Sequence, residues 1–233
     1  MSNKYVDFVS DTHFKKCVKE VWNSYNSQIR LDKELQKNGI DPIKMMFDIK
    51  YHNLNFKSWK QRESIRQNSK TSGDRIGEFH QNLLGGVRGW TNLETGHGSG
   101  LDLKKDDDTI FMELKNKNND LNDNVEKALR TKMLAQHKKT PDAIIYFAYI
   151  CATNKKSEEK HWKPTTKYKK KLHHEKIRRI SGSRVYELVT GKKDALKQVY
   201  DALPPAIKDV SNIDNALSRK DQKEFDKWFG LAY

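Results

Sequence analysis

The chain has 233 residues, which is enough for one large domain with a substantial hydrophobic core. Its formal net charge of +14 favours a polyanionic partner, because Lys and Arg side chains that neutralise phosphates release counterions from nucleic acid. A solvated basic surface would give the same charge. The first thirty residues carry charges throughout, which argues against a signal peptide, and no apolar run approaches the roughly 18 residues of a membrane span, so we expect no membrane partner.

Helices are predicted in the N-terminal part of the chain. Residues 10–25 place apolar side chains at helical spacing, with Ser10 or Asp11 as the N-terminal cap. A second helix is predicted to begin at Pro42 and a third to cover residues 56–67. The aromatic side chains of these helices fit a packed core better than base-stacking platforms.

The central part of the sequence predicts a sheet between helices. One helix is expected over residues 74–84, where Gly85 and Gly86 would end it, and another over residues 121–138. Residues 142–151 form a nearly continuous apolar run, which is typical of a strand covered on both faces. Three shorter segments have β character: residues 87–94, 101–104 and 109–115.

The last third of the chain begins with a basic segment, residues 155–179, which is predicted to be a long loop. A strand is expected over residues 184–190 and a helix over residues 192–203, which Pro204 and Pro205 would end. The two cysteines, Cys17 and Cys151, lie in apolar surroundings and are expected to be buried free thiols, which fits the cytoplasm.

This order of elements predicts the α/β class, with a mixed β-sheet flanked by helices. We expect a single domain over residues 1–233. It would consist of a helical N-terminal part (1–72), a core that holds the sheet (73–203) and C-terminal helices (204–233).

The segment from Leu101 to Lys115 carries the strongest candidate for chemistry. By the two-residue period of a strand, Glu113 and Lys115 share one face. A two-residue turn at Asp107 and Asp108 would place Asp102 directly opposite Glu113 on the neighbouring strand. Two carboxylates side by side repel each other unless a cation lies between them, and their hard oxygen ligands suit Mg²⁺.

This unit of two acids and one amine suits phosphodiester hydrolysis. A bound metal ion polarises a phosphoryl oxygen and lowers the pKa of a bound water. Lys115 would orient or help to deprotonate that water, or stabilise the charge that develops on the phosphoryl group. The competing interpretation is a surface hairpin with an ordinary cross-strand pair of Glu113 and Lys115.

Other acidic and basic residues are weaker candidates. The run from Asp106 to Asp108 is better explained as turn residues than as metal ligands. Glu78 lies on the helix before the sheet, where it could approach the metal site or be a solvated helix charge. The basic segment 155–179 also contains Trp162 and Tyr168, so it could grip DNA phosphates or be a solvated loop.

The order Asp102, then Glu113-Leu-Lys115, fits the motif of the PD-(D/E)xK nuclease superfamily, with Leu101 at the place of the motif's proline. Longer stretches from about residue 10 to 210 resemble a family of type II restriction endonucleases that cut 5′-GGNCC. The resemblance rests on five stretches, residues 40–48, 76–90, 100–104, 113–117 and 180–192.

The resemblance implies a restriction endonuclease fold with residues 73–203 as the catalytic core, and cleavage of double-stranded DNA with Mg²⁺. It carries Asp102, Glu113 and Lys115 over as the catalytic residues. It also implies a metal bound by the two carboxylates and the Leu114 backbone carbonyl, with Glu78 as a further candidate ligand.

The same resemblance implies a bacterial restriction–modification system with a cognate DNA methyltransferase as a functional partner. A palindromic target implies a homodimer, because two-fold symmetric DNA is most simply read by a two-fold symmetric protein. The extra helices, residues 10–25 or those after Pro205, are candidates for the dimer contact, or they pack on their own core. Lys169, Lys170 and Lys171 are the candidate contacts to the DNA backbone.

Two other functions fit the same residues. One is a repair or recombination nuclease of the same fold that acts on DNA structure. The other is a non-catalytic DNA-binding module, although the presence of Asp102, Glu113 and Lys115 speaks against it.

Overall fold

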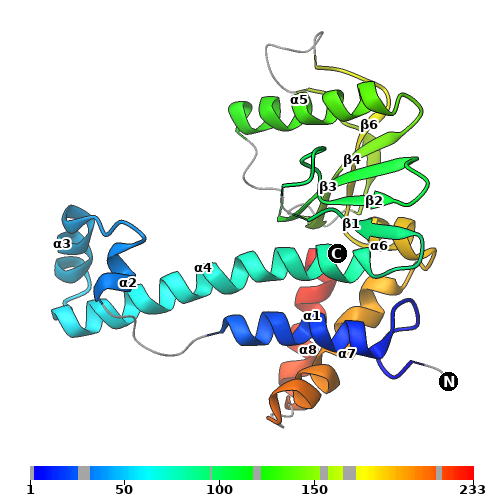
Figure 1. Cartoon of the computed structure of the whole chain (residues 1–233). Coiled ribbons are helices and arrows are strands. Elements are labelled where there is room, and N and C mark those ends of the chain that lie inside the picture. Colours follow the sequence, from blue (N-terminus) through cyan, green and yellow to red (C-terminus); the bar gives the residue numbers. More distant parts are fainter. Residues whose placement is uncertain are drawn as a thin grey trace. The chain divides into compact units, whose positions relative to one another are not determined.

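The computed structural model describes residues 3–25, 32–94, 96–117, 122–152, 157–164, 172–213 and 217–233 (Figure 1). The chain divides into two compact units. One unit contains residues 1–19 and 77–233 and holds the sheet, and the other contains residues 20–76 and is helical. None of the helices in the described ranges has the length and apolar composition that crossing a bilayer requires.

The sheet of the larger unit has six strands in the order β1-β2-β3-β4-β6-β5. The β1/β2, β2/β3 and β5/β6 pairs are antiparallel, whereas β3/β4 and β4/β6 are parallel, so the predicted mixed sheet is confirmed. The strands are β1 Trp90–Asn92, β2 Leu103–Lys105, β3 Ile110–Lys117, β4 Ile144–Cys151, β5 Glu159–His161 and β6 Ile177–Ser181.

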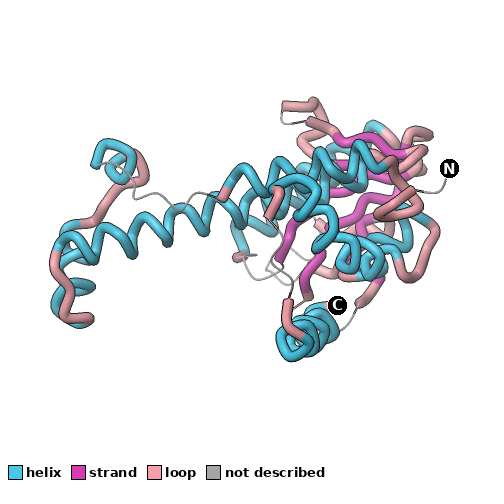
Figure 2. Tube along the Cα trace, turned by 90° about the horizontal axis from the view of Figure 1, so that it is seen from below, coloured by secondary structure: helices cyan, strands magenta, loops and turns pink. Residues whose placement is uncertain are grey.

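Helices flank this sheet (Figure 2). The helices of the larger unit are α5 Asp123–Lys139, α6 Ser183–Thr190, α7 Ala195–Ser211 and α8 Arg219–Ala232, together with parts of α1 Asp11–Ser24 and α4 Phe56–Gly85. The central strand β4 is buried along almost its whole length, as its apolar run predicted. The predicted cap of α1 is also confirmed, because the Ser10 hydroxyl accepts a hydrogen bond from the His13 backbone N–H at 3.2 Å.

Helix α5 covers one face of the sheet with Leu129 and Met133, which belong to the same buried cluster as Phe147 of β4. Trp162 lies in this cluster and stacks on Phe147, with 4.7 Å between the ring centroids. The guanidinium group of the buried Arg130 lies 3.9 Å from the centroid of the Trp162 ring. Trp162 is therefore a core residue, and the prediction that it helps a basic loop to grip DNA is wrong for this side chain.

Three other predictions about secondary structure are wrong. Residues 184–190 form helix α6 and not a strand, because Val185, Tyr186 and Val189 are buried at helical spacing. Helix α7 continues through Pro204 and Pro205, with Ala202 and Ala206 buried on either side. The predicted helices 56–67 and 74–84 are one helix, α4, of 30 residues.

The segment 155–179, predicted to be a long loop, also contains strand β5 Glu159–His161 and the beginning of strand β6 Ile177–Ser181. These two strands pair antiparallel with each other. Tyr168 and the run Lys169–Lys171 lie outside the described residues.

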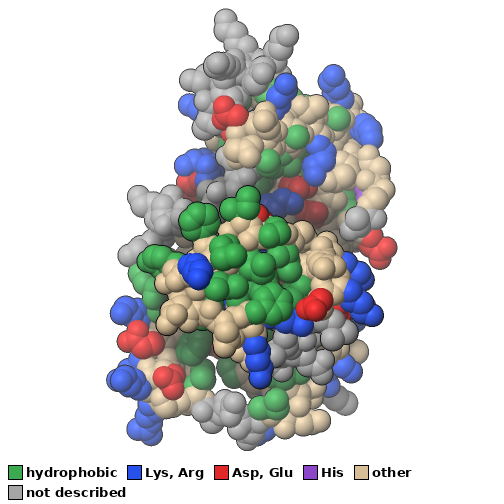
Figure 3. Space-filling view, turned by 90° about the vertical axis from the view of Figure 1, so that its left-hand side faces the viewer, with side chains coloured by type: hydrophobic (Ala, Val, Ile, Leu, Met, Phe, Trp, Pro, Cys, Tyr) green, Lys and Arg blue, Asp and Glu red, His purple; other side chains and the backbone are tan. Residues whose placement is uncertain are grey.

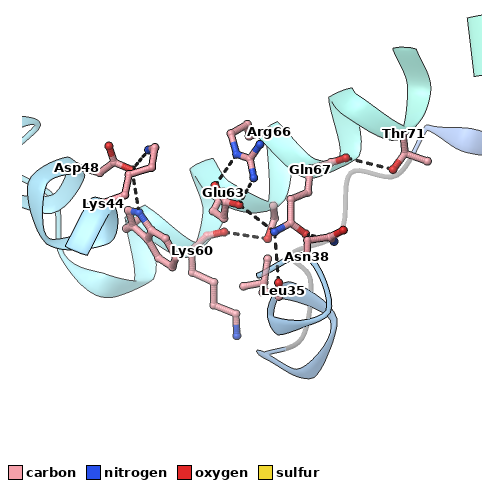
Figure 4. A network of polar contacts seen from close by, with 11 residues as sticks. Leu35, Asn38, Lys44, Asp48, Lys60, Glu63, Arg66, Gln67 and Thr71 are labelled. Atoms are coloured by element: carbon pink, nitrogen blue, oxygen red, sulfur yellow. Dashed lines mark hydrogen bonds and ion pairs between the residues drawn. The ribbon is translucent and has the colours of Figure 1, made fainter. Parts of the chain in front are cut away.

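The helical unit contains α2 Asp32–Gln36, α3 Pro42–Tyr51 and the first part of α4. Helix α3 begins at Pro42 as predicted, and the Asp41 side chain caps it by accepting a hydrogen bond from the Ile43 backbone N–H. Gln67 of α4 connects α2 to α4, because its side chain donates to the Leu35 carbonyl of α2 at 3.5 Å and accepts from Asn38, just after α2, at 2.8 Å (Figure 4).

A buried histidine is expected to make the larger unit sensitive to acid. His80 of α4 contacts the Tyr186 hydroxyl through Nδ1 at 2.6 Å, and burial lowers the pKa of His80 to about 4. Protonation thus favours the unfolded chain, where this pKa is about 6.5. We expect His80 to contribute stability that is present above pH 6.5 and lost as the pH falls toward 4, by about 3 kcal/mol.

The measurement is chemical denaturation at pH 7 and pH 4 of the unmodified chain and the His80→Gln variant. The variant should lose less stability between the two pH values, since Gln has no charge to gain. An equal loss in both chains would contradict this assignment.

Candidate active site

Strands β2 and β3 bring Asp102 and Glu113 together. Leu103 pairs with Met112 and Lys104 with Phe111, which is the predicted register, and Asp102 stands directly before this ladder. The Asp102 backbone N–H donates to the Met112 carbonyl at 2.9 Å, and its carboxylate accepts from the Leu114 N–H at 2.7 Å. Asp102 is therefore hydrogen bonded to the residues on both sides of Glu113.

The connecting turn differs slightly from the prediction. Its hydrogen bond runs from the Asp108 N–H to the Lys105 carbonyl, and Asp108 adopts a positive φ of 57°. Asp107 accepts hydrogen bonds from the backbone and hydroxyl of Thr109. These bonds are typical of an Asx turn, and they agree with the interpretation of the aspartate run as turn residues.

The two carboxylates differ from ordinary surface acids because they are shielded from water. Glu113 is only 5% exposed, and Asp102 is partly buried beside it. Burial raises the pKa of Asp102 above its usual value, and the charge of Glu113 raises it further, while the hydrogen bond from Leu114 opposes both. This arrangement favours a cation between or beside the two side chains.

Two lysines supply positive charge to Glu113. Lys115 Nζ lies 2.8 Å from Glu113 Oε1, which confirms that the two side chains share a face of β3. Burial acts to lower the pKa of Lys115, but its hydrogen bond to Glu113 and the charges of Glu113 and Asp102 leave that pKa raised overall. Half of the Lys115 side chain remains exposed to solvent.

The second cation, Lys132, comes from α5 and was not anticipated from the sequence. Its Nζ lies 2.6 Å from Glu113 Oε2, and it also donates to the backbone carbonyl of Gly100. Gly100 has a φ of +63°, and a Cβ there would approach Lys132 Cδ to 3.0 Å. A glycine at position 100 thus leaves room for the Lys132 side chain to reach Glu113.

The backbone of β3 also faces helix α4. The Leu114 carbonyl, a predicted metal ligand, accepts a hydrogen bond from Gln81 Nε2 at 3.3 Å. Glu78 lies one helical turn before Gln81 and is exposed. Within the described ranges, no three Asp, Glu, His or Cys side chains form a group that could hold a metal ion. The candidate active site therefore has two carboxylates, those of Asp102 and Glu113.

A mixed sheet with helices around it, and an aspartate beside a Glu-x-Lys strand, define a nuclease of the restriction endonuclease-like class. The chain belongs to the Eco47II restriction endonuclease family, whose model matches residues 6–212.

Two named relatives align with most of the chain. It is 36% identical over 219 residues to the type II restriction enzyme Sau96I of Staphylococcus aureus, an alignment that covers 90% of this chain and 82% of the relative. It is 33% identical over 212 residues to the type II restriction enzyme Eco47II of Escherichia coli, with 87% of each protein covered.

Proposed function

We propose that this protein is a type II restriction endonuclease that cleaves double-stranded DNA at a short palindromic site, GGNCC, by Mg²⁺-dependent phosphodiester hydrolysis. The observation that carries the proposal is the shielded pair of Asp102 and Glu113 with Lys115 on the same face, in a chain of a restriction endonuclease family. Both named relatives are type II restriction enzymes, which supports site-specific cleavage of DNA.

The residues present fit a divalent metal ion. Asp102, Glu113 and the Leu114 carbonyl would hold it, and all three offer hard oxygen atoms of the kind that Mg²⁺ prefers. Mg²⁺ sites commonly use one or two carboxylates and leave several positions to water and substrate phosphate, so a third carboxylate from Glu78 is optional. When bound, the ion polarises a phosphoryl oxygen and lowers the pKa of a water molecule.

Lys115 is the group of this chain that would act on the reacting atoms. Its ammonium is fixed by Glu113 on one side while half of the side chain reaches solvent, so Nζ can contact both the carboxylate and a water or phosphate outside it. In this position the ammonium orients the attacking water and stabilises negative charge on the phosphoryl group.

Lys132 is proposed to be a positioning residue for Glu113, because it holds Oε2 while Lys115 holds Oε1. The Lys132→Met variant is expected to lose about 1–3 kcal/mol of stability in EDTA, since a shielded carboxylate loses a charged hydrogen-bond donor. Ca²⁺ should then raise the melting temperature of the variant more than that of the unmodified chain, because a divalent ion replaces the missing charge. Lys132→Arg should restore part of the stability.

Thermal melts with and without Ca²⁺ give this result without measuring cleavage. Equal Ca²⁺-induced shifts in the Lys132→Met variant and the unmodified chain would show that Lys132 does not act through Glu113.

We further propose that Lys169, Lys170 and Lys171 contact the DNA backbone, as the basic sequence around them suggests. Replacing all three with Gln should weaken binding to any duplex and flatten the dependence of the binding constant on salt. Binding measured at several salt concentrations tests this, and an unchanged slope would count against the contact.

The proposed setting is the bacterial cytoplasm, with a cognate methyltransferase that protects host DNA at the same sites. The proposed assembly is a homodimer, because a two-fold symmetric target presents one equivalent phosphodiester bond on each strand. The direct test of the function is digestion of a sequenced plasmid in Mg²⁺. Discrete fragments that end at GGNCC sites support it, whereas structure-dependent nicking or no cleavage would overturn it.

A further inference from the structure

Helix α3 (Pro42–Tyr51) of the helical unit is apolar on more than one side. Its sequence, PIKMMFDIKY, contains six large apolar or aromatic side chains in ten residues, yet none of its residues is buried. A helix that is apolar all round is normally covered all round. Helix α3 is therefore a short element with more apolar surface than this chain covers.

One side of α3 packs within its own unit. The partly buried residues Met45, Asp48 and Ile49 follow helical spacing, and the Trp59 indole N–H of α4 donates to Asp48 at 3.4 Å. The other side, formed by Ile43, Met46, Phe47 and Tyr51, is between 56% and 86% exposed. These four residues are spaced by three, four and eight positions from Ile43 and form one stripe, the α3 face.

In Figure 3 the helical unit with α3 faces the viewer, and hydrophobic side chains gather on its surface. If a whole aromatic side chain offers about 200 Å², the α3 face leaves on the order of 500 Å² of mainly apolar surface uncovered. That is near the largest patch that a typical monomer exposes. Two such faces together approach about 1,000 Å², the area at which a biological interface becomes plausible.

We propose that the α3 face is the contact between two copies of this chain, which deepens the two-chain assembly proposed above. The stripe is complementary to itself when two α3 helices pack antiparallel around a two-fold axis near Met46 and Phe47. Ile43 of one copy then meets the region of Tyr51 of the other. The N-terminal end with Asp41 meets the C-terminal end with Lys50, so that opposite charges and opposite ends of the helix dipoles lie together.

The same face is a poor match for DNA. A DNA-binding surface needs cations that neutralise phosphates, but the stripe is apolar and Lys44 beside it is already paired with Asp48. Four large apolar side chains left in contact with water would also carry a risk of aggregation. A second copy of the chain removes this risk by covering them.

The test compares Phe47→Glu with a matched control, Ile65→Glu. Ile65 is also apolar, 64% exposed and in the same unit, but it is outside the α3 face. By multi-angle light scattering, the unmodified chain and Ile65→Glu should have the mass of two chains, and Phe47→Glu the mass of one at the same concentration. Circular dichroism and thermal melts check that each variant is folded.

A second variant covers the case in which Phe47→Glu does not fold. In Met46→Cys, oxidation should link two chains near the proposed axis, whereas Ile65→Cys should give no such product. The proposal is overturned if folded Phe47→Glu keeps the two-chain mass, if Met46→Cys does not cross-link, or if Phe47→Glu loses DNA binding without changing mass. An unmodified chain that is monomeric yet cuts GGNCC would overturn the interface and leave the proposed function intact.

Discussion

Replacing Glu113 with Ala is expected to lower the rate of DNA cleavage by roughly 10³-fold or more, because the carboxylate would hold the metal ion and fix Lys115. Asp102→Ala and Lys115→Ala should have losses of the same order. Binding to a cognate duplex in Ca²⁺ should change little, since these residues act on one phosphodiester bond and not on the whole contact surface. Single-turnover cleavage and a Ca²⁺ binding titration measure the two effects separately.

The hairpin itself offers a matched control for these variants. Asp107 lies in the turn between the same two strands, and Asp107→Asn keeps the acceptor that bonds Thr109. This variant should cut DNA at the rate of the unmodified chain. Normal cleavage by Glu113→Ala, or a loss in Asp107→Asn as large as that in Glu113→Ala, would remove the assignment of the active site.

Removing divalent metal is expected to have an equally large effect. Cleavage should stop in EDTA and return with Mg²⁺ or Mn²⁺, because Asp102 and Glu113 would provide the oxygen ligands for the ion that polarises the phosphate. Ca²⁺ should support binding with little cutting, since its looser coordination positions the attacking water poorly.

The measurement is cleavage of one plasmid substrate across a titration of each ion after dialysis against EDTA. Full activity in the chelator would exclude the proposed mechanism. Dialysed protein should also remain folded, because Lys115 and Lys132 balance the charge of Glu113 when no ion is added.

The central hairpin could be predicted from the sequence because its signals are local. The alternation of Ile110 to Lys115 assigns side chains to faces, and a run of aspartates marks the turn, so the register of the two strands followed. The hydrogen bond of the turn joins the Asp108 N–H to the Lys105 carbonyl and not the pair expected, but the register of the strands is the one predicted. Short-range patterns thus determined the part of the site that consists of two adjacent strands.

Lys132 could not be predicted in the same way. It is one of several lysines on α5, and nothing in its immediate sequence distinguishes it. Its contact with Glu113 depends on how α5 packs on the sheet, which brings together residues 19 positions apart. The only sequence signal was the glycine at position 100, whose role becomes clear once the Lys132 side chain is seen beside it.

Packing also explains the errors. Trp162 lies among lysines in the sequence, so the composition of the segment 155–179 suggested a DNA-binding loop. Its contacts with Phe147 and Arg130 instead place Trp162 in the core. Residues 184–190 contain β-branched and aromatic side chains, which favour strands, yet their buried positions recur with helical spacing. In both cases long-range contacts outweighed the local preference.

The most direct test of the account uses two short duplexes that differ by one base pair. One contains a single GGNCC site, and in the other the first G·C pair of that site is replaced by A·T. In Mg²⁺ the protein should cut both strands of the first duplex and leave the second intact, and Glu113→Gln should cut neither. Equal cutting of the two duplexes, or cutting by Glu113→Gln at the rate of the unmodified chain, would contradict the central claim.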